Sequence, residues 1–222
     1  MEEKDESKKN VGGIFESVFD ILYLSFDLFA GILFFVFSHG QKEFFLFGAL
    51  ALVLGGGDAF HLIPRIKVNL VGRDEKSEFY LGLGKAITSV TMTVFYLILL
   101  WIYKTLFPSH PVTLWMLILI YGCAAFRIVV CFFPGNHWFD GKENLTFSLL
   151  RNVPFLILGV LEMVLFGMAG MPRISIAMAI SFACYIPVTL FAKKVPMLGM
   201  LMMPKTLAYV WMIAEGLALL TF

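Results

Sequence analysis

Acidic, imidazole and basic side chains follow one another within the apolar segment ALVLGGGDAFHLIPR. Asp58, His61 and Arg65 stand at positions i, i+3 and i+7, so a helix would carry them on one face. A carboxylate beside an imidazole suits general acid–base chemistry, and a nearby guanidinium suits the binding of an anion. We therefore predict Asp58 and His61 as catalytic residues, with Asp58 activating water and His61 orienting it or sharing its proton.

Further basic residues lie inside other apolar segments. A charged side chain within a membrane span is energetically unfavourable, and such a residue usually has a functional role. Lys85, Arg151 and Lys205 each stand near the start of a segment, and Arg127 stands about four turns into another. Several bases around one acid in a medium of low dielectric constant favour the binding of an anionic ligand. The phosphate of a phospholipid is the nearest source of such an anion. With the polar groups at neighbouring turns, the predicted substrate-binding residues are Arg65, Lys85, Ser89, Arg127, Arg151, Asn152, Tyr185, Lys205 and Tyr209.

Simpler structural roles stay open for each of these residues. Bases at helix ends extend to lipid headgroups in many membrane proteins, and Asp58 could form a structural ion pair with Arg127 or Lys85. Asp20 and Asp27 share one face of the first segment, from which they could join the same chamber. Gly55, Gly56 and Gly57 fit either a close helix crossing or a locally opened backbone.

The elements that must position these residues are membrane-spanning helices. Of the 222 residues, 59% are hydrophobic and only 15% are charged, which is too apolar for an ordinary soluble domain. A spanning helix needs about 20 mainly apolar residues. We predict an all-α bundle of seven transmembrane helices in one domain, 15–222, after a polar disordered tail, 1–14. The predicted spans are 15–38, 43–65, 80–106, 111–133, 146–169, 173–192 and 197–221.

Lys and Arg residues in short loops predict the orientation, because they are retained on the cytoplasmic side. On the N-terminal side of the predicted bundle lie Lys4, Lys8, Lys9, Arg65, Lys67, Arg73, Lys76, Lys142, Lys193 and Lys194, against Lys42, Lys104 and Arg173 on the other side. This asymmetry predicts a multi-pass protein with its N-terminus inside and its C-terminus outside. The composition favours a bacterial plasma membrane as the location of the protein, and the endoplasmic reticulum membrane is left as the alternative.

Cofactor and nucleic-acid signatures are not found in the sequence, and we expect neither a cofactor nor a nucleic-acid partner. No close histidine spacing of a zinc site occurs, so no metal site is predicted, although a metal at His61 or His137 is left open. The segment FPGNHWFDG reads as an ordinary turn carrying an interfacial aromatic residue, Trp138.

Three stretches resemble the YhhN family of membrane lysoplasmalogenase-like proteins. ALVLGGGDAF is similar to the family's small-residue stretch ending in Gly-Asp, here Gly57 and Asp58. FYLGLGKAITSVTMTVFY is similar to its third span, and ISFACYIPVTLF with MMPKTLAYVWMIAE resembles its final pair in spacing. The chain departs from the family at Cys184-Tyr185, where the family has Ser-Asp. The resemblance implies a helical bundle and hydrolysis of an ether bond in a lipid.

The sequence thus predicts an integral membrane protein with a basic, cytoplasm-facing pocket within the membrane. The first hypothesis is a hydrolase or related enzyme acting on an anionic lipid or lysolipid headgroup. The second is a non-enzymatic carrier of a small anion or lipid, which would use Gly55–Gly57 as its gate. A sensory or scaffold role and a homo-oligomeric state are left open.

Overall fold

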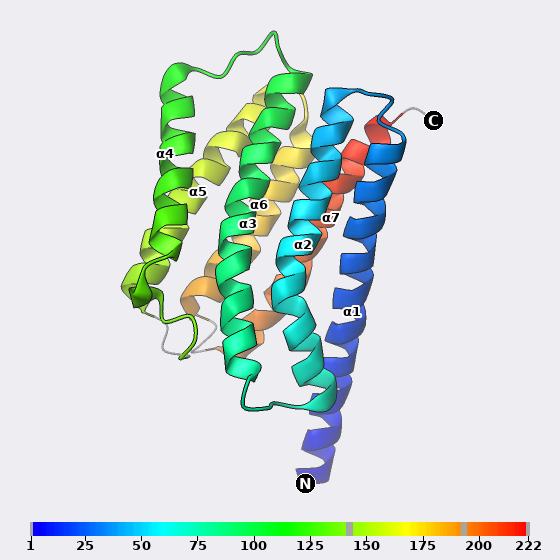
Figure 1. Ribbon diagram of the computed structural model, residues 1–222, viewed down its shortest axis with the longest axis vertical. Helices are drawn as coiled ribbons and strands as arrows, with labels where there is room; N and C mark the ends of the chain where they lie inside the picture. The colour runs from blue at the N-terminus through cyan, green and yellow to red at the C-terminus, as the bar shows by residue number, and fades with distance from the viewer. Residues whose placement is uncertain (1, 141–143, 192–194, 221–222) are drawn as a thin grey trace.

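The fold is a bundle of antiparallel helices, with the N-terminus at one end and the C-terminus at the other (Figure 1). The computed structural model describes residues 2–140, 144–191 and 195–220. The α-helices are α1 (Glu2–Val36), α2 (Lys42–Val71), α3 (Ser77–Leu106), α4 (Leu114–Cys131), α5 (Leu145–Met168), α6 (Pro172–Phe191) and α7 (Met202–Leu219). Short 3-10 turns, η1 (Pro134–Asn136) and η2 (Pro196–Leu201), precede α5 and α7.

The predicted all-α architecture is confirmed. Within the described residues, seven helices are long and apolar enough to cross a membrane, and no strand occurs there. Helices α2 and α3 extend beyond the predicted spans, because polar turns at their ends continue the helical backbone. The predicted tail 1–14 and the orientation of the termini stay predictions, and Lys142, Lys193 and Lys194, used for the orientation, lie outside the described residues.

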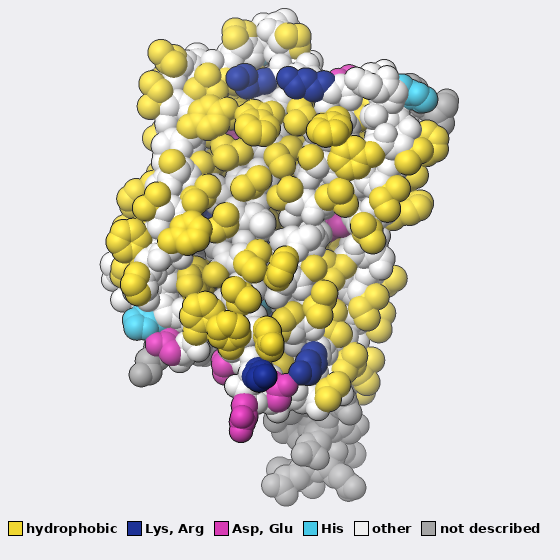
Figure 2. Space-filling view, in the orientation of Figure 1, with side chains coloured by type: hydrophobic (Ala, Val, Ile, Leu, Met, Phe, Trp, Pro, Cys, Tyr) yellow, Lys and Arg dark blue, Asp and Glu magenta, His cyan; other side chains and the backbone are white. Residues whose placement is uncertain are grey.

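The surface of the bundle has the polarity that such helices require. Figure 2 shows one face on which hydrophobic side chains cover the middle, while most charged side chains lie near the two ends. Helices that follow one another in the chain pack together, and α7 returns to contact α1 and α2. The helices therefore form a closed ring with an interior that side chains from several helices share.

Aromatic side chains fill the centre of this ring. The ring of Tyr96 lies edge-on to that of Phe155 at 5.0 Å, and Phe95 meets Tyr209 at 5.4 Å. Such edge-to-face pairs add to the area they bury. Because Phe155 and Tyr209 also face a cavity nearer the N-terminal end, this aromatic layer forms one wall of that cavity.

The turn between α2 and α3, at the same end of the bundle, is held by side-chain hydrogen bonds. Lys67 donates to Asp74 at 2.6 Å, and the Ser77 hydroxyl donates to the same carboxylate at 2.6 Å. The hydrogen bond from Lys67 and that from Ser77 lower the pKa of the exposed Asp74 carboxyl to about 2. Asp74 therefore stays ionised throughout the physiological range, and the turn keeps its ion pair there.

The glycines of α2 form close helix contacts. A Cβ at Gly57 would lie 2.0 Å from the Thr91 hydroxyl on α3, and Thr88 donates to the Gly57 carbonyl at 3.1 Å. Helix α2 continues without interruption through Gly55–Gly57. Of the two interpretations that the sequence left open, the close crossing agrees with these contacts.

Replacing Gly57 with alanine is expected to lower the free energy of unfolding by about 1–3 kcal/mol, because the added methyl group meets Thr91 in a packed interface. The neighbouring Gly56 has open space at its Cβ position and provides a matched control. Gly56→Ala is expected to change the stability by less than about 1 kcal/mol. Denaturant unfolding of both variants in the same detergent tests this, and equal stabilities would contradict the close crossing.

Candidate functional site

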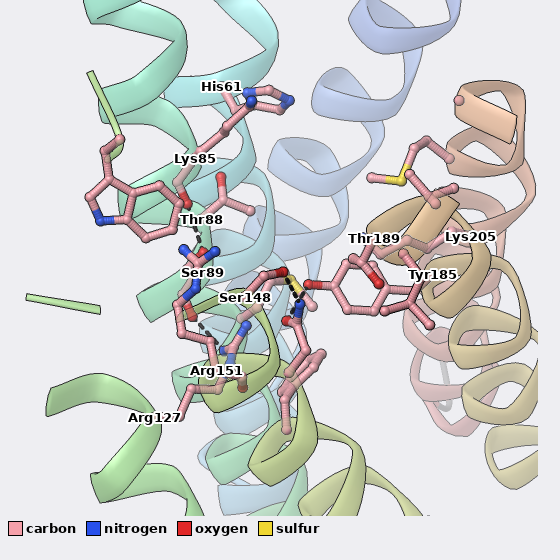
Figure 3. Close-up of a pocket in the computed structure, with 18 of the residues that line it drawn as sticks. His61, Lys85, Thr88, Ser89, Arg127, Ser148, Arg151, Tyr185, Thr189 and Lys205 are labelled. Atoms are coloured by element: carbon pink, nitrogen blue, oxygen red, sulfur yellow. Dashed lines mark hydrogen bonds between the residues drawn. The ribbon is translucent and has the colours of Figure 1, made fainter. Parts of the chain in front are cut away.

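The predicted site residues meet in one cavity of about 540 Å³ near the N-terminal end of the bundle. Helices α2 to α7 all contribute to its wall. Figure 3 shows His61, Lys85, Arg127 and Arg151 on one side and Tyr185, Thr189 and Lys205 on the other. His61 and all the predicted substrate-binding residues line it, namely Arg65, Lys85, Ser89, Arg127, Arg151, Asn152, Tyr185, Lys205 and Tyr209. Asp58 is not among the lining residues.

Arg127 uses its guanidinium to connect three helices. Its Nε donates to the Arg151 carbonyl on α5 at 3.1 Å, and one terminal nitrogen donates to the Ser89 carbonyl and the Thr93 hydroxyl on α3. The guanidinium also lies 4.0 Å from the centre of the Phe155 ring. Arg127 is only 2% exposed. It therefore shapes the cavity wall by holding α3, α4 and α5 together.

Aromatic rings support the other two deeply placed bases. The Arg151 guanidinium lies 4.0 Å from the centre of the Trp138 ring. The Lys205 ammonium lies 4.8 Å from the Tyr209 ring centre and 5.4 Å from that of Tyr185. A ring face attracts a cation electrostatically, which offsets part of the cost of removing that cation from water. The aromatic groups thus hold the charged ends of Arg151 and Lys205 in the cavity wall.

Polar groups on α5 and α6 form a short hydrogen-bonded chain in the same wall. The Tyr185 hydroxyl donates to the Asn152 side-chain oxygen at 2.8 Å, and the Asn152 amide donates to Ser148 at 3.3 Å. Because Asn152 is fixed from both sides, the Tyr185 ring beside Lys205 has a defined position. The predicted roles of Asn152 and Tyr185 are therefore compatible with their placement.

The α2 residues divide between the cavity and α1. His61 lines the cavity, and Gly84 of α3 packs directly against its backbone, where a Cβ would lie 2.5 Å from the His61 Cα. Arg65 forms a salt bridge with Glu16 of α1 at the rim, where both side chains are partly exposed. Asp58 is 9% exposed and accepts a hydrogen bond from the Tyr23 hydroxyl of α1 at 2.8 Å. His61 and Arg65 thus share the cavity wall as predicted, and Arg65 also contacts α1 at the rim, whereas Asp58 lies outside the wall and bonds α1 instead.

Trp138 is a wall residue that the sequence interpretation placed in an ordinary interfacial turn. Its indole N–H donates to the Cys131 carbonyl at 3.0 Å, and the Asn136 amide donates to the Val130 carbonyl at 2.7 Å. A Cβ at Gly82 of α3 would lie 1.9 Å from the Trp138 carbonyl oxygen. These contacts hold the segment against α3, so the Trp138 ring reaches the cavity.

Tyr23, which hydrogen-bonds Asp58, is the second residue that the sequence analysis did not identify. It lies on a helix that was considered only for its two aspartates. The signal was present: Glu16, Asp20, Tyr23 and Asp27 recur at helical spacing and share one face of α1. Two further polar wall residues that were not predicted, Thr88 and Thr189, have hydroxyl side chains that often bond their own helix backbone and so give no distinct signal.

Metal-ligand groups do not converge in the part of the chain that the structure describes, where no three His, Cys, Asp or Glu residues could hold one ion. His137, one of the two histidines left open for a metal, bonds Asp140 at 2.7 Å in an exposed position. His61, the other, belongs to the cavity wall. The cavity wall therefore brings together basic, hydroxyl and imidazole side chains, which are groups that in general bind anions and transfer protons.

Comparison of the chain with protein-family models, with curated proteins and with solved structures finds no match.

Proposed function

We propose that this protein is an integral membrane protein whose cavity binds the anionic headgroup of a lipid or lysolipid and hydrolyses it or carries out a related reaction. The observation that carries this proposal is that five helices direct Arg65, Lys85, Arg127, Arg151 and Lys205 to one cavity. Arg127, Arg151 and Lys205 are buried in its wall, while Arg65, which pairs with Glu16, and Lys85 lie nearer solvent. A wall with this excess of basic side chains raises the local positive potential and favours an anionic ligand. A phosphate group provides that charge and accepts several N–H bonds at once.

An amphipathic ligand fits the remaining lining. Leu145, Val188, Leu190 and Met202 contribute apolar surface to the same cavity. A volume of about 540 Å³ falls within the roughly 300–1,000 Å³ of ordinary small-molecule sites. The surrounding bilayer, in which the seven apolar helices fit, would supply a molecule that has both a charged and an apolar part.

His61 is the proposed group for proton exchange with the substrate, because it is the imidazole residue among those that line the cavity. Asp58, predicted from the sequence as the group that activates water, lies outside the wall, and its charge interacts with that of Lys205. In this proposal Asp58 therefore acts as a positioning residue through Lys205. The resemblance to the YhhN family suggests an ether bond as the bond cleaved, and this too is a proposal.

A carrier of a small anion or lipid would use the same cavity, but it also needs a moving part. The segment Gly55–Gly57, considered as its gate, packs against Asp27 on one side and Thr91 on the other. These contacts favour the enzyme over the carrier. We further propose a bacterial plasma membrane as the location, with the cavity open to the cytoplasm.

The test uses purified protein in phosphatidylcholine nanodiscs supplied with lysophosphatidylglycerol in two forms, one with an acyl ester and one with an alkenyl ether chain, with products followed by mass spectrometry. Replacing His61 with asparagine is expected to lower the turnover by about 100-fold or more while binding changes little, since general acid–base groups contribute about 10²–10⁴-fold. His39→Asn is the matched control, because His39 is exposed in a left-handed conformation that asparagine tolerates.

The outcomes separate the candidate functions. Binding without cleavage, combined with uptake of the anion into vesicles, would establish the carrier and exclude the enzyme. Absence of binding to any anionic headgroup would remove the anion site itself. Cleavage that His61→Asn leaves intact would show that another group exchanges the proton.

A further inference from the structure

A second polar layer lies behind the cavity, between α1 and α2. Glu16, Asp20, Tyr23 and Asp27 follow one face of α1 at helical spacing, and that face contacts α2. At its outer end Glu16 binds Arg65, and at its inner end Tyr23 donates to Asp58. This layer thus leads from the N-terminal end of the bundle to two buried carboxylates.

The two carboxylates, Asp27 and Asp58, are close neighbours. Tyr23 lies one turn before Asp27 on α1, and its hydroxyl bonds Asp58 at 2.8 Å. Asp27 packs on Gly55, one turn before Asp58, where a Cβ would lie 2.7 Å from the Asp27 Cβ. Asp27 is 0% exposed, neither of its oxygens has a hydrogen bond of ordinary geometry within the described residues, and the Tyr23 hydroxyl interacts with its carboxylate.

The titratable and charged groups around this pair come from four helices. On α1, Asp20 and Glu16 continue the acidic face, and on α2 the next titratable groups are His61 and Arg65. From α7, Lys205 interacts electrostatically with Asp58, and the Tyr209 hydroxyl is beside Lys205. Lys85 of α3 acts on this region through His61. Lys205 is therefore the cation of the cavity wall whose charge acts on Asp58.

Two ionised carboxylates are too costly to keep in this place. An ionised carboxylate buried without a partner loses several kcal/mol of hydration, and the charge of a second carboxylate nearby adds repulsion. The Tyr23 hydroxyl and the Lys205 ammonium stabilise one ionised carboxylate better than they stabilise two. The pair is therefore in a position to hold a proton, and the amount it holds depends on how fully Lys205 balances Asp58.

We infer that Asp27, Tyr23 and Asp58 form a buried proton-binding site that Lys205 links to the anion cavity, so that an anion and a proton bind together. This inference rests on the proposed anion-binding function. When an anion approaches Lys205, it takes up part of the positive charge that had stabilised the ionised acid pair. The pair then binds a proton from solvent, and the net charge of the interior changes less than it would with the anion alone.

Calorimetric titration of the full-length protein in a non-ionic detergent tests this link. The probes are sulfate and dihexanoyl phosphatidylglycerol, whose own protonation does not change near neutral pH. Repeating each titration in buffers with different ionisation enthalpies gives the number of protons taken up. We expect about one proton per anion in the range where the pair titrates, with the affinity rising by up to about tenfold for each pH unit of acidification.

Variants identify the group that binds the proton. Asp27→Asn keeps the shape of the side chain and is expected to abolish proton uptake while sulfate still binds. Tyr23→Phe keeps both carboxylates, so uptake is expected to remain, but its pH range should move because ionised Asp58 loses a donor. This second variant keeps the test decisive if Asp27→Asn does not fold. His61→Gln is the control for the other titratable group nearby, and uptake is expected to persist in it.

The result that overturns the inference is anion binding without proton uptake in the unmodified protein, or uptake that His61→Gln removes and Asp27→Asn leaves unchanged. Failure of both probes to bind would instead refute the proposed anion site. A tighter binding of dihexanoyl phosphatidylglycerol than of sulfate, with equal proton uptake, would assign the site to a lipid headgroup; equal affinities would assign it to a free anion.

Discussion

Replacing Arg127 with methionine is expected to lower the free energy of unfolding by about 3 kcal/mol or more, the largest effect on stability among the variants considered. The substitution removes the donors that join α4 to the Arg151 carbonyl on α5 and to the Ser89 carbonyl and the Thr93 hydroxyl on α3. A lost hydrogen bond to a charged group costs about 1.5–3 kcal/mol, and a buried group left unpaired adds to that. Equilibrium unfolding in detergent, followed by circular dichroism, measures the change.

Two variants show whether the geometry of Arg127 or merely its charge matters. Arg127→Lys keeps the charge but cannot bond α3 and α5 together, so we expect most of the destabilisation to remain. Arg173→Met removes an exposed base near Glu215 and is expected to cost less than about 1 kcal/mol. If Arg127→Lys were as stable as the unmodified protein, the connection of three helices by a planar guanidinium would be wrong.

Replacing Lys205 with methionine is expected to weaken the binding of dihexanoyl phosphatidylglycerol by roughly 10–100-fold. Lys205 is only 7% exposed, and its ammonium is held beside the rings of Tyr185 and Tyr209 in the cavity wall. A charge-assisted hydrogen bond contributes about 1.5–3 kcal/mol, and each 1.4 kcal/mol is about tenfold in affinity. Calorimetry with the purified variant measures the dissociation constant.

Lys104→Met provides the comparison for Lys205. Lys104 is an exposed residue in the last turn of α3, at the other end of the bundle from the cavity. We expect its replacement to leave the dissociation constant within about twofold, because exposed charges at that distance are screened by salt. Unchanged affinity in folded Lys205→Met protein would remove the central base from the proposed anion site.

The helical bundle could be predicted because it depends on local features of the chain. Each span is a run of apolar residues about as long as a bilayer is thick, and such a run can satisfy its backbone polar groups only as a helix. The ends were predicted less well: α4 occupies Leu114–Cys131 within the expected 111–133, and α2 continues to Val71 beyond the expected 65. Helix ends depend on turn contacts such as that of Lys67 with Asp74, which apolarity does not report.

The membership of the cavity wall could also be predicted in large part, because bases inside apolar helices must face protein or a wet cavity. The individual tasks of these side chains could not. Arg127, whose predicted role in substrate binding stays a prediction, also donates hydrogen bonds to α3 and α5, and its position in the sequence did not indicate these bonds. Trp138 was expected at an interface, and its ring lies on Arg151. Such tasks depend on which neighbour comes within about 3–4 Å, and sequence spacing does not specify that distance.

The sequence by itself determined that this protein is a bundle of apolar helices. It also determined that the few buried bases and acids need polar partners, because the cost of burying a charge is a property of each residue and its immediate chain. Only the tertiary structure decided which partner each of these residues has. Tyr23, not Arg127 or Lys85, bonds Asp58, and α1 thereby separates Asp58 from the cavity that His61 lines. The physical reason is that helix rotation and approach are determined by contacts between distant segments, such as Gly57 against Thr91 and Gly55 against Asp27, and these contacts exist only once the helices have packed.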